Sequence, residues 1–521
     1  MSFGVDLDGN LSESNVLSRR LPDIFEPAYE LSESGYWNFK MLLNGSWCTK
    51  AERLEVRSPI DGSLVATIPS ASTAEADLAV EAAYANRSSI RVIPAVKKIE
   101  IFQHTRELLL QNSESFVSVL ALEAGKPRSS AQGEVKATAE RLKLTPEEYG
   151  KIRGEHIPGD WSDETIGTDA DVLREPLGVI LAISPFNYPL YITATKVIPA
   201  LLAGNSVIVK TSSKDPISFL MFARLLEVAG IPATCLNVIT GRGSIGEHLA
   251  SQDKISMLTF TGSTEIGRTL AKVAGLKRLH MELGGKGCAI VLNDADLELA
   301  VSETVKGCLS YSGQRCDAIS RVFVEEGVAD KFVKKVVAQV AGYKMGDPRD
   351  ASVRLGPLID HGAVERVHEL VTDAVQRGAK VLAGGKYQGN FYQATVLDMV
   401  PMDARIMWEE TFGPVIPIGH VKDVDEAIQL ANKSTFGLDS CVFTNNINLA
   451  RKVAKRLEEG EVTINAAPRH GVGYYPFGGN KDSGMGREGI GYSIEEMTRL
   501  KTIVYNWKPA KVWGDLIKES D

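Results

Sequence analysis

The chain has 521 residues, more than one hydrophobic core usually serves, so two or three domains are expected. Hydrophobic residues make up 44% and charged residues 24%, a composition that argues against a disordered or fibrous protein. The net charge of −8, with no basic block, argues against nucleic acid as the main partner.

Three features indicate a cytoplasmic protein. The first residues are polar and acidic and do not have the pattern of a signal peptide. The most apolar stretches, such as residues 177–183, are far shorter than the roughly 20 residues of a membrane-spanning helix. The six cysteines lack metal-ligand or disulfide-framework spacing, so we expect reduced thiols and no metal site.

The amino-terminal part is less regular than the rest. Residues 1–35 show no interpretable pattern, and we expect them to form an arm packed on a neighbouring subunit. Ser72 with Glu75 forms a capping-box pattern and predicts a helix start. Residues 151–176, rich in Gly, Asp and Thr, predict a protruding hairpin.

Two alternations of strand and helix patterns follow. The first contains the runs LGVILAIS, NSVIVK, CLNVIT and ISMLTFTG between residues 177 and 290. The second contains CAIVL, SRVFVEE, a helix over 329–341, a helix opened by Asp423 and a strand near VTINAA. The pattern predicts two α/β lobes on parallel sheets, an architecture that holds dinucleotides at strand carboxyl ends. The tail 501–507 predicts a lone strand whose partner lies outside its lobe, and an oligomer contact would supply one.

The run FTGSTEIG (260–267) has the features of a phosphate-binding turn. A strand ends near Phe260, Gly262 turns the chain, and a helix begins near Ser263. Free N–H groups and the helix dipole at such a start favour anions. The spacing is not G-x-G-x-x-G, so a plain strand–turn–helix connection is an equally good interpretation.

Two further residues bear on the cofactor. Lys210, at the end of NSVIVK, is a candidate ribose or phosphate contact, although a lone strand-end lysine is usually just solvated. An acidic residue beside the adenosine ribose would select NAD by repelling a 2′-phosphate. Ser213 in that place favours NADP, with NAD as the alternative.

Three residues could perform chemistry on an aldehyde. Cys316 lies in SYSGQRCDA beside Arg315, whose charge would help to populate the thiolate. Glu282, in MELGGK, precedes two glycines and suits a general base. Asn187, between prolines in SPFNYP, suits an oxyanion donor. Each also has a structural interpretation: a packed cysteine, a turn carboxylate and a turn amide.

From about residue 40 to 507 the chain resembles the aldehyde dehydrogenase superfamily. The stretches that carry the resemblance occur in the superfamily's order: SPFNYP, FTGSTEIG, MELGGK, GQRC, EETFGP (409–414) and PFGGNKDSG (476–484). It implies an α/β fold with two parallel-sheet lobes and a small β oligomerisation element, usually in a dimer or tetramer. We expect a cofactor-binding domain of residues 36–150 and 177–282 and a catalytic domain of residues 283–485. Residues 151–176 and 498–515 would form an oligomerisation hairpin and a C-terminal strand.

The resemblance also implies roles for individual residues. Cys316 would be the nucleophile, Glu282 the base that activates water, and Asn187 with the Cys316 N–H the oxyanion hole. Glu410 would hold the nicotinamide ribose. The remaining cofactor contacts would be Ser184, Phe186, Lys210, Ser213, Gly262, Ser263, Gly267, Leu283 and Phe412.

Within the superfamily, the chain is most similar to non-phosphorylating, archaeal-type glyceraldehyde-3-phosphate dehydrogenases. The stretches that carry this similarity are GEHIPGDW, YSGQRCDAI and PRHGVGYYPFGG. A phosphorylated aldehyde needs cations at the substrate mouth, and arginine binds phosphate bidentately. Arg315 and Arg469 lie in segments expected to border Cys316, and Arg141 or Lys143 is a third candidate. The alternative for each arginine is a surface salt bridge.

Three other functions are weighed against this one. The chemistry could serve another small aldehyde, such as glyceraldehyde, succinate semialdehyde or lactaldehyde. An inactive cofactor-binding or structural protein is disfavoured because Cys316 and Glu282 are both present. A CoA-acylating enzyme is disfavoured because it has no need of the hydrolytic base Glu282.

Overall fold

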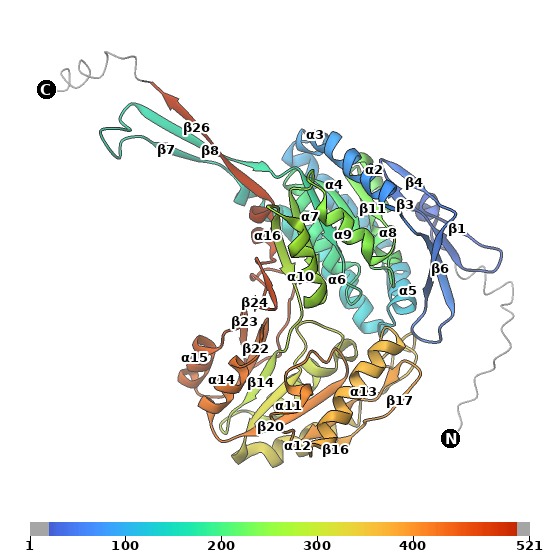
Figure 1. Cartoon of the computed structure of the whole chain (residues 1–521), viewed down its shortest axis with the longest axis vertical. Helices are drawn as coiled ribbons and strands as arrows, with labels where there is room; N and C mark the ends of the chain where they lie inside the picture. Colours follow the sequence, from blue (N-terminus) through green and yellow to red (C-terminus); the bar gives the residue numbers. More distant parts are fainter. Residues whose placement is uncertain (1–19, 508–521) are drawn as a thin grey trace.

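The computed structural model describes residues 20–507. It contains two α/β lobes, one above the other, and a long β-hairpin that extends away from the upper lobe (Figure 1). Within the described residues, no helix is both long and apolar enough to cross a membrane.

The upper lobe is built on an eight-stranded sheet. Its strands are β3 (Met41–Leu43), β4 (Ser46–Cys48), β9 (Val179–Ile183), β10 (Ser206–Lys210), β11 (Leu236–Ile239), β12 (Met257–Thr261), β13 (Arg278–Glu282) and β25 (Gly484–Met485). They lie in the order β25-β13-β12-β9-β10-β11-β3-β4. The run from β13 to β11 is parallel, as the alternation of patterns predicts, and antiparallel strands close both edges.

Helices cover both faces of this sheet, because side chains alternate across each strand. Ile180 and Ala182 pack in one core cluster, and Leu181 packs in the other. The first face carries α4 (Ala95–Gln111), α5 (Ser113–Glu123), α6 (Arg128–Leu144), α7 (Tyr191–Leu202) and α8 (Ile217–Ala229). The second carries α2 (Thr73–Ala85), α9 (Gly243–Ser251) and α10 (Thr264–Ala274). Strands buried on both faces need apolar residues throughout, which explains the uninterrupted runs.

The lower lobe repeats this design around a seven-stranded sheet. Its strands are β14 (Cys288–Val291), β15 (Arg321–Glu325), β16 (Lys380–Ala383), β19 (Thr395–Asp398), β20 (Val415–Val421), β22 (Asp439–Phe443) and β23 (Glu461–Ile464). One face packs on α11 (Leu297–Leu309) and α12 (Glu326–Val340), and the other on α13 (His361–Gln376), α14 (Val424–Asn432) and α15 (Ile447–Arg456).

Shorter elements complete the chain. A four-stranded sheet contains β1 (Tyr29–Leu31), β2 (Trp37–Phe39), β5 (Arg53–Arg57) and β6 (Leu64–Pro69). Two-stranded sheets pair β17 (Tyr387–Gln388) with β18 (Phe391–Tyr392), and β21 (Phe436–Gly437) with β24 (Asn480–Lys481). The remaining α-helices of the described residues are α3 (Arg87–Arg91) and α16 (Ile490–Glu496).

The segment expected to be an amino-terminal arm divides in two. Residues 1–19 lie outside the described residues. Phe25, Ala28 and Tyr29 are buried in the core of the upper lobe, so this part of residues 1–35 packs on its own chain. The expectation of an arm on a neighbour is therefore wrong for residues 25–29.

The carboxyl-terminal strand has its partner in the same chain. β26 (Thr498–Asn506) pairs antiparallel with β8 (Thr168–Pro176), which pairs in turn with β7 (Glu155–Pro158). The three strands form the protruding sheet of Figure 1, so the hairpin expected over residues 151–176 is present. The partner does lie outside the lobe, but no second subunit is needed to supply it. Residues 508–515 of the expected segment lie outside the described residues.

The predicted helix starts are confirmed. In α2 the Glu75 carboxylate accepts the Ser72 N–H at 2.7 Å. In α14 the Asp423 carboxylate accepts the Glu426 N–H at 2.9 Å. In both, a side chain satisfies one of the N–H groups that a helix start leaves free.

Candidate active site

A cavity of about 510 Å³ lies between residues of the two lobes. It brings together two of the three predicted catalytic residues, Asn187 and Cys316. Its lining comprises Pro185, Phe186, Asn187, Lys214, Thr261, Gly262, Ser263, Leu283, Cys316, Ile359, Asp360, Ala363, Arg366, Glu410, Thr411 and Phe412.

An unusual turn presents Cys316 to this cavity. Tyr311, Ser312 and Gly313 have φ values of 49°, 54° and 72°, so three successive residues adopt the left-handed conformation. Two hydrogen bonds hold it, from the Tyr311 hydroxyl to the Ala124 carbonyl and from the Ser312 hydroxyl to the Gly356 carbonyl, both 2.8 Å. Strain of this kind persists only where the surroundings impose it, and it is commonly found at functional sites.

The thiol of Cys316 is not activated by its neighbours. Burial raises its pKa well above the ordinary value, and the carboxylates of Asp317, Asp439 and Glu282 raise it further. Arg315 has the opposite effect, but both carboxylate oxygens of Asp317 accept hydrogen bonds from its guanidinium, at 2.9 and 2.7 Å. Arg315 therefore acts in the expected direction, but burial and the three carboxylates outweigh it, and its charge is compensated by Asp317 two residues away.

Asn187, the predicted oxyanion donor, lines the same cavity as Cys316. It follows β9, and its side chain is buried on the wall that also carries Cys316. Within residues 20–507, no group accepts a hydrogen bond from its side-chain amide. The amide N–H is thus available to an oxygen in the cavity.

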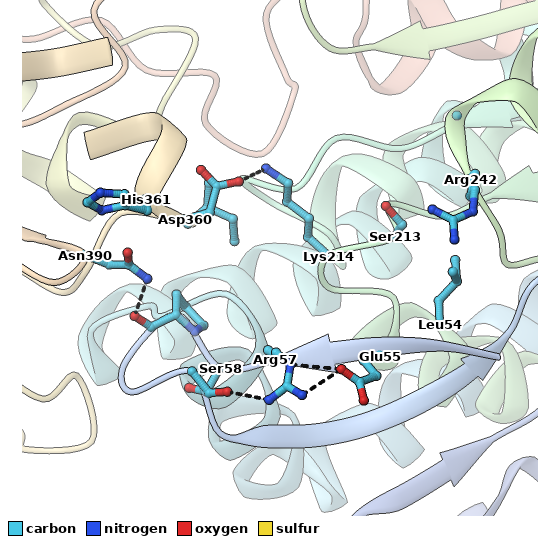
Figure 2. Close-up of a pocket in the computed structure, with 14 residues that line it drawn as sticks. Leu54, Glu55, Arg57, Ser58, Ser213, Lys214, Arg242, Asp360, His361 and Asn390 are labelled. Atoms are coloured by element: carbon cyan, nitrogen blue, oxygen red, sulfur yellow. Dashed lines mark hydrogen bonds and ion pairs between the residues drawn. The ribbon is translucent and has the colours of Figure 1, made fainter. Parts of the chain in front are cut away.

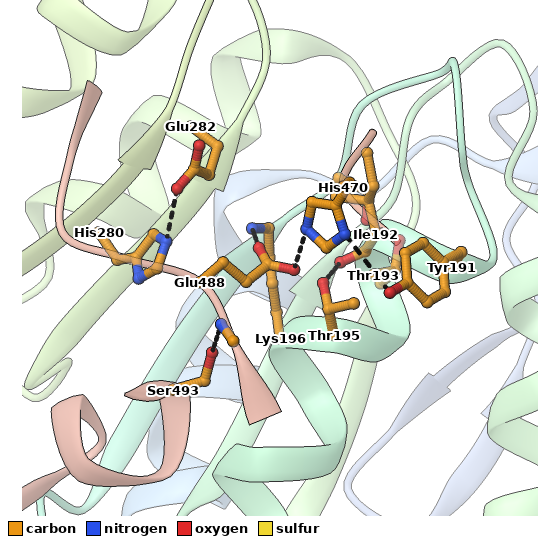
Figure 3. A network of polar contacts seen from close by, with 12 residues as sticks. Tyr191, Ile192, Thr193, Thr195, Lys196, His280, Glu282, His470, Glu488 and Ser493 are labelled. Atoms are coloured by element: carbon orange, nitrogen blue, oxygen red, sulfur yellow. Dashed lines mark hydrogen bonds and ion pairs between the residues drawn. The ribbon is translucent and has the colours of Figure 1, made fainter. Parts of the chain in front are cut away.

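Glu282, the third predicted residue, ends β13 beside the cavity. Among the described residues it is absent from the lining, although its neighbour Leu283 is part of it. Its Oε1 atom lies 3.2 Å from Nε2 of His280 (Figure 3). Burial raises the pKa of Glu282, and the nearby His280 counteracts part of that rise.

The predicted phosphate-binding turn has its expected geometry. β12 ends at Thr261, and Ser263 caps α10 by accepting the Ile266 N–H at 3.4 Å. Gly262 and Ser263 line the cavity, so the free N–H groups at the start of α10 open towards it. Gly267 is placed differently: a Cβ there would lie 2.4 Å from the Leu283 side chain, so this glycine allows close packing of helix and strand.

The nicotinamide end of the predicted cofactor site is formed by residues of both lobes. The Glu410 carboxylate accepts the Gly285 N–H at 3.2 Å, and burial raises its pKa. Phe412, with a φ of 49°, packs edge-on against Phe186 at 5.6 Å between ring centroids. Ser184 lies deeper and accepts a hydrogen bond from the Thr193 hydroxyl at 2.7 Å. Glu410, Phe412 and Phe186 therefore face the cavity, and Ser184 supports its wall.

A second cavity, of about 680 Å³, continues from the first through Lys214 and Asp360 (Figure 2). Ser213 and Arg242 lie on its lining. Within residues 20–507 the Arg242 side chain has no hydrogen-bond or ion-pair partner, whereas Lys214 is paired with Asp360. Lys210 is in the lining of neither cavity: it is buried at the end of β10, donates to the Thr211 carbonyl at 2.7 Å, and burial lowers its pKa to about 8.

These residues fit a dinucleotide that carries a 2′-phosphate. Ser213 does not repel an anion, and Arg242 offers a free cation at the start of α9. The sequence interpretation missed Arg242. Its signal was available, because the turn TGRG follows the strand CLNVIT just as FTGS follows the next strand.

The three predicted phosphate-binding arginines meet around one loop, residues 468–473, but differ in their surroundings. Arg141 is fully buried and donates to the Val472 carbonyl at 3.1 Å, while its Nε and Nη2 atoms have no hydrogen-bond partner in the part of the chain that the structure describes. Arg315 is paired with Asp317. The Arg469 side chain is 63% exposed and lies 4.0 Å from Glu303. Lys143, the alternative to Arg141, is exposed on α6.

Comparisons with known proteins agree with this geometry. The model of the aldehyde dehydrogenase family matches residues 47–503. The NADP-dependent glyceraldehyde-3-phosphate dehydrogenase of Streptococcus equinus is 40% identical over 470 residues, 90% of this chain and 98% of that protein. The 3-sulfolactaldehyde dehydrogenase of Priestia aryabhattai is 37% identical over 469 residues, 90% of this chain and 98% of that protein.

A solved structure is also similar. The NADP-dependent glyceraldehyde-3-phosphate dehydrogenase from Bacillus halodurans C-125, complexed with NADP, superposes with a TM-score of 0.89 at 40% identity. The match covers 90% of this chain and 100% of that one.

Proposed function

Because the chain belongs to the aldehyde dehydrogenase family, we propose that it oxidises glyceraldehyde 3-phosphate to 3-phosphoglycerate with NADP, without inorganic phosphate. The reaction uses a thioester on Cys316. The observation that favours a phosphorylated substrate is Arg141, a fully buried cation beside loop 468–473 whose Nε and Nη2 atoms have no hydrogen-bond partner in the described chain.

The first half-reaction forms a carbon–sulfur bond. The Cys316 thiol releases its proton to solvent, and the thiolate sulfur attacks the aldehyde carbon. The Asn187 amide and the Cys316 N–H donate to the oxygen that becomes negative, a type of stabilisation that is commonly the largest single contribution. When bound, oxidised NADP would supply the hydride acceptor. The oxyanion returns to a carbonyl as the C–H bond breaks with its electron pair, and a thioester on Cys316 remains.

The second half-reaction is hydrolysis. Glu282 takes a proton from water as the water oxygen attacks the thioester carbon. The C–S bond breaks, the carboxylic acid leaves, and the sulfur is released as the thiol or thiolate. Burial raises the pKa of Glu282 above its ordinary value, which suits a group that must accept a proton and later lose it.

The residues around the two cavities would hold NADP. Gly262, Ser263 and the start of α10 favour the pyrophosphate, and Glu410 faces the nicotinamide ribose. Ser213 and Arg242 favour the 2′-phosphate, with Lys210 nearby.

The test is a comparison of substrates. The purified protein is mixed with NADP and D-glyceraldehyde 3-phosphate in the absence of phosphate and arsenate, and absorbance of the reduced nicotinamide is followed. Parallel reactions contain NAD, glyceraldehyde, succinate semialdehyde, lactaldehyde or 3-sulfolactaldehyde, and a Cys316→Ser variant is the control. Cys316-dependent reduction with the phosphorylated aldehyde, at the highest kcat/KM, supports the proposal.

A preference for another aldehyde contradicts the substrate but not the chemistry. The compensation of Arg315 by Asp317 is the observation that favours a less charged substrate such as lactaldehyde. Cofactor binding without turnover of any aldehyde contradicts the chemistry itself.

A further inference from the structure

The proposed base Glu282 shares one face of β13 with a histidine. Side chains two residues apart in a strand point to the same side, so His280 and Glu282 are neighbours by local geometry alone. His280 Nε2 lies 3.2 Å from Glu282 Oε1, and His280 Nδ1 lies 2.6 Å from Glu496 Oε2. One imidazole therefore bridges the carboxylate of β13 and a carboxylate at the end of α16.

The carboxylate of Glu282 is held on the side of His280. A Cβ on Gly478 would lie 2.9 Å from Glu282 Oε1, so the carboxylate packs closely against the backbone at Gly478. Oε2 of Glu282 is buried with no hydrogen-bond partner in the described chain. The interaction with His280 is thus the only side-chain hydrogen bond that the structure gives this carboxylate within residues 20–507.

The charged groups around this pair decide its protonation. Burial by itself lowers the pKa of His280, but hydrogen bonds to Glu282 and Glu496 outweigh burial and raise it to about 9. Lys196, from α7, acts in the opposite direction on His280. Glu282 also faces Glu488, which raises its pKa, and Lys196, which lowers it. Near neutral pH His280 is therefore an imidazolium that is hydrogen-bonded to Glu282 and Glu496.

We infer that His280 is a positioning residue that holds the Glu282 carboxylate ionised and turned away from Cys316 until hydrolysis requires it. The inference rests on the proposed role of Glu282 as the hydrolytic base. Glu496 has a defined part in this arrangement, because it competes with Glu282 for the charge of His280.

The inference predicts opposite effects for the two partners of His280. The rate of thioester hydrolysis falls at low pH, and this acid limb of the pH–rate profile reports the protonation of Glu282, because only the carboxylate can accept a proton from water. A cation lowers the pKa of a neighbouring carboxylate, so its removal moves the limb to higher pH, by about one unit or more. Removal of the Glu496 charge leaves the imidazolium to Glu282 alone and moves the limb to lower pH.

The experiment measures hydrolysis separately from hydride transfer. In the absence of cofactor, the Cys316 thiolate attacks 4-nitrophenyl acetate, the C–O bond breaks, and 4-nitrophenolate leaves as the acetyl thioester forms. The burst of nitrophenolate reports acylation, and the steady phase reports attack of water on the thioester. The pH dependence of the steady phase is compared for the native protein, His280→Leu, His280→Gln and Glu496→Gln.

Two variants serve as controls, one for misfolding and one for the general effect of replacing a histidine that pairs with a carboxylate. His280→Gln retains a hydrogen-bond donor without the charge, so it preserves packing if His280→Leu does not fold. His420→Gln alters another histidine–carboxylate pair, 2.9 Å from Asp398 in the lower lobe, and is expected to keep the native profile.

We expect the acid limb to rise by about one pH unit in both His280 variants, which is about a tenfold loss of hydrolysis below the limb. Glu496→Gln is expected to shift it the other way. An unchanged limb in a folded His280 variant, with activity scaled equally at every pH, would overturn the inference. A Glu282→Gln control distinguishes the two hypotheses: if that variant hydrolyses the thioester at the native rate, the base assignment itself is wrong.

Discussion

The cofactor end and the substrate end of the cleft use arginine in different ways. At the cofactor end, Arg242 lines an open cavity and has no partner among the described residues. At the substrate end, the guanidinium of Arg315 is occupied by Asp317, and Arg469 is largely exposed near Glu303. Of the three arginines near loop 468–473, Arg141 alone combines complete burial with guanidinium nitrogens that have no hydrogen-bond partner among residues 20–507. The position of an arginine in a motif therefore does not tell whether its charge is available to a ligand.

The largest expected effect tests the substrate end. Arg141→Leu should lower kcat/KM for glyceraldehyde 3-phosphate by about 100-fold, because hydrogen bonds to a charged group contribute about 1.5–3 kcal/mol. Unphosphorylated glyceraldehyde should be little affected. Steady-state kinetics with both substrates checks this, and Lys143→Leu, an exposed residue of the same helix, is the matched control. Equal losses with both aldehydes would show that Arg141 supports the fold rather than the phosphate.

Arg242→Leu tests the cofactor end. It should raise the Kd of NADP by about 10- to 100-fold and leave that of NAD nearly unchanged, since only NADP carries the 2′-phosphate. Fluorescence titration with both nucleotides provides the measurement. Arg57 lines the same cavity but is paired with Glu55 at 2.7 Å, so Arg57→Leu should raise the Kd of NADP by less than about threefold. Parallel losses of NADP and NAD affinity in Arg242→Leu would contradict the assignment.

The ion pair that compensates the charge of Arg315 can be removed by mutation of Asp317. In Asp317→Asn the arginine charge becomes available to the thiol and one negative charge is lost, so the pKa of Cys316 should fall. Alkylation by iodoacetamide at pH 8 should then be about tenfold faster for each unit by which the pKa falls. In the native protein the alkylation rate should still be rising at pH 9, because the pKa of the thiol is raised. Asp403→Asn, at a surface pair with Arg377, is the control. A native rate that is already constant at neutral pH would contradict the raised pKa.

The smallest effect is expected at Arg469. The side chain is 63% exposed and 4.0 Å from Glu303, and exposed ion pairs contribute at most about 1 kcal/mol. Arg469→Leu should change KM for the phosphorylated aldehyde by less than about threefold in the same assay. A loss as large as that of Arg141→Leu would mean that loop 468–473 closes on the substrate and brings Arg469 inward.

Much of the fold followed from local patterns. The runs that became β9, β10, β11 and β12 are apolar throughout because parallel strands are covered on both faces. Ser72 and Asp423 marked helix starts because a side chain there satisfies free N–H groups. The partner of β26 could not be predicted, because strand pairing is a non-local choice that a single run of residues does not contain.

The sequence by itself determined the family, the order of the motifs and the residue types that can perform the chemistry. Each motif is local, so its residues and its spacing can be read directly from the sequence. Only the tertiary structure decided which of those groups carry an available charge. Asp317 compensates Arg315, His280 bridges Glu282 to Glu496, and Arg141 turns inward while Lys143 faces solvent. The physical reason is that burial and hydrogen-bond partners set the pKa and the binding strength of a side chain, and segments far apart in the chain supply both.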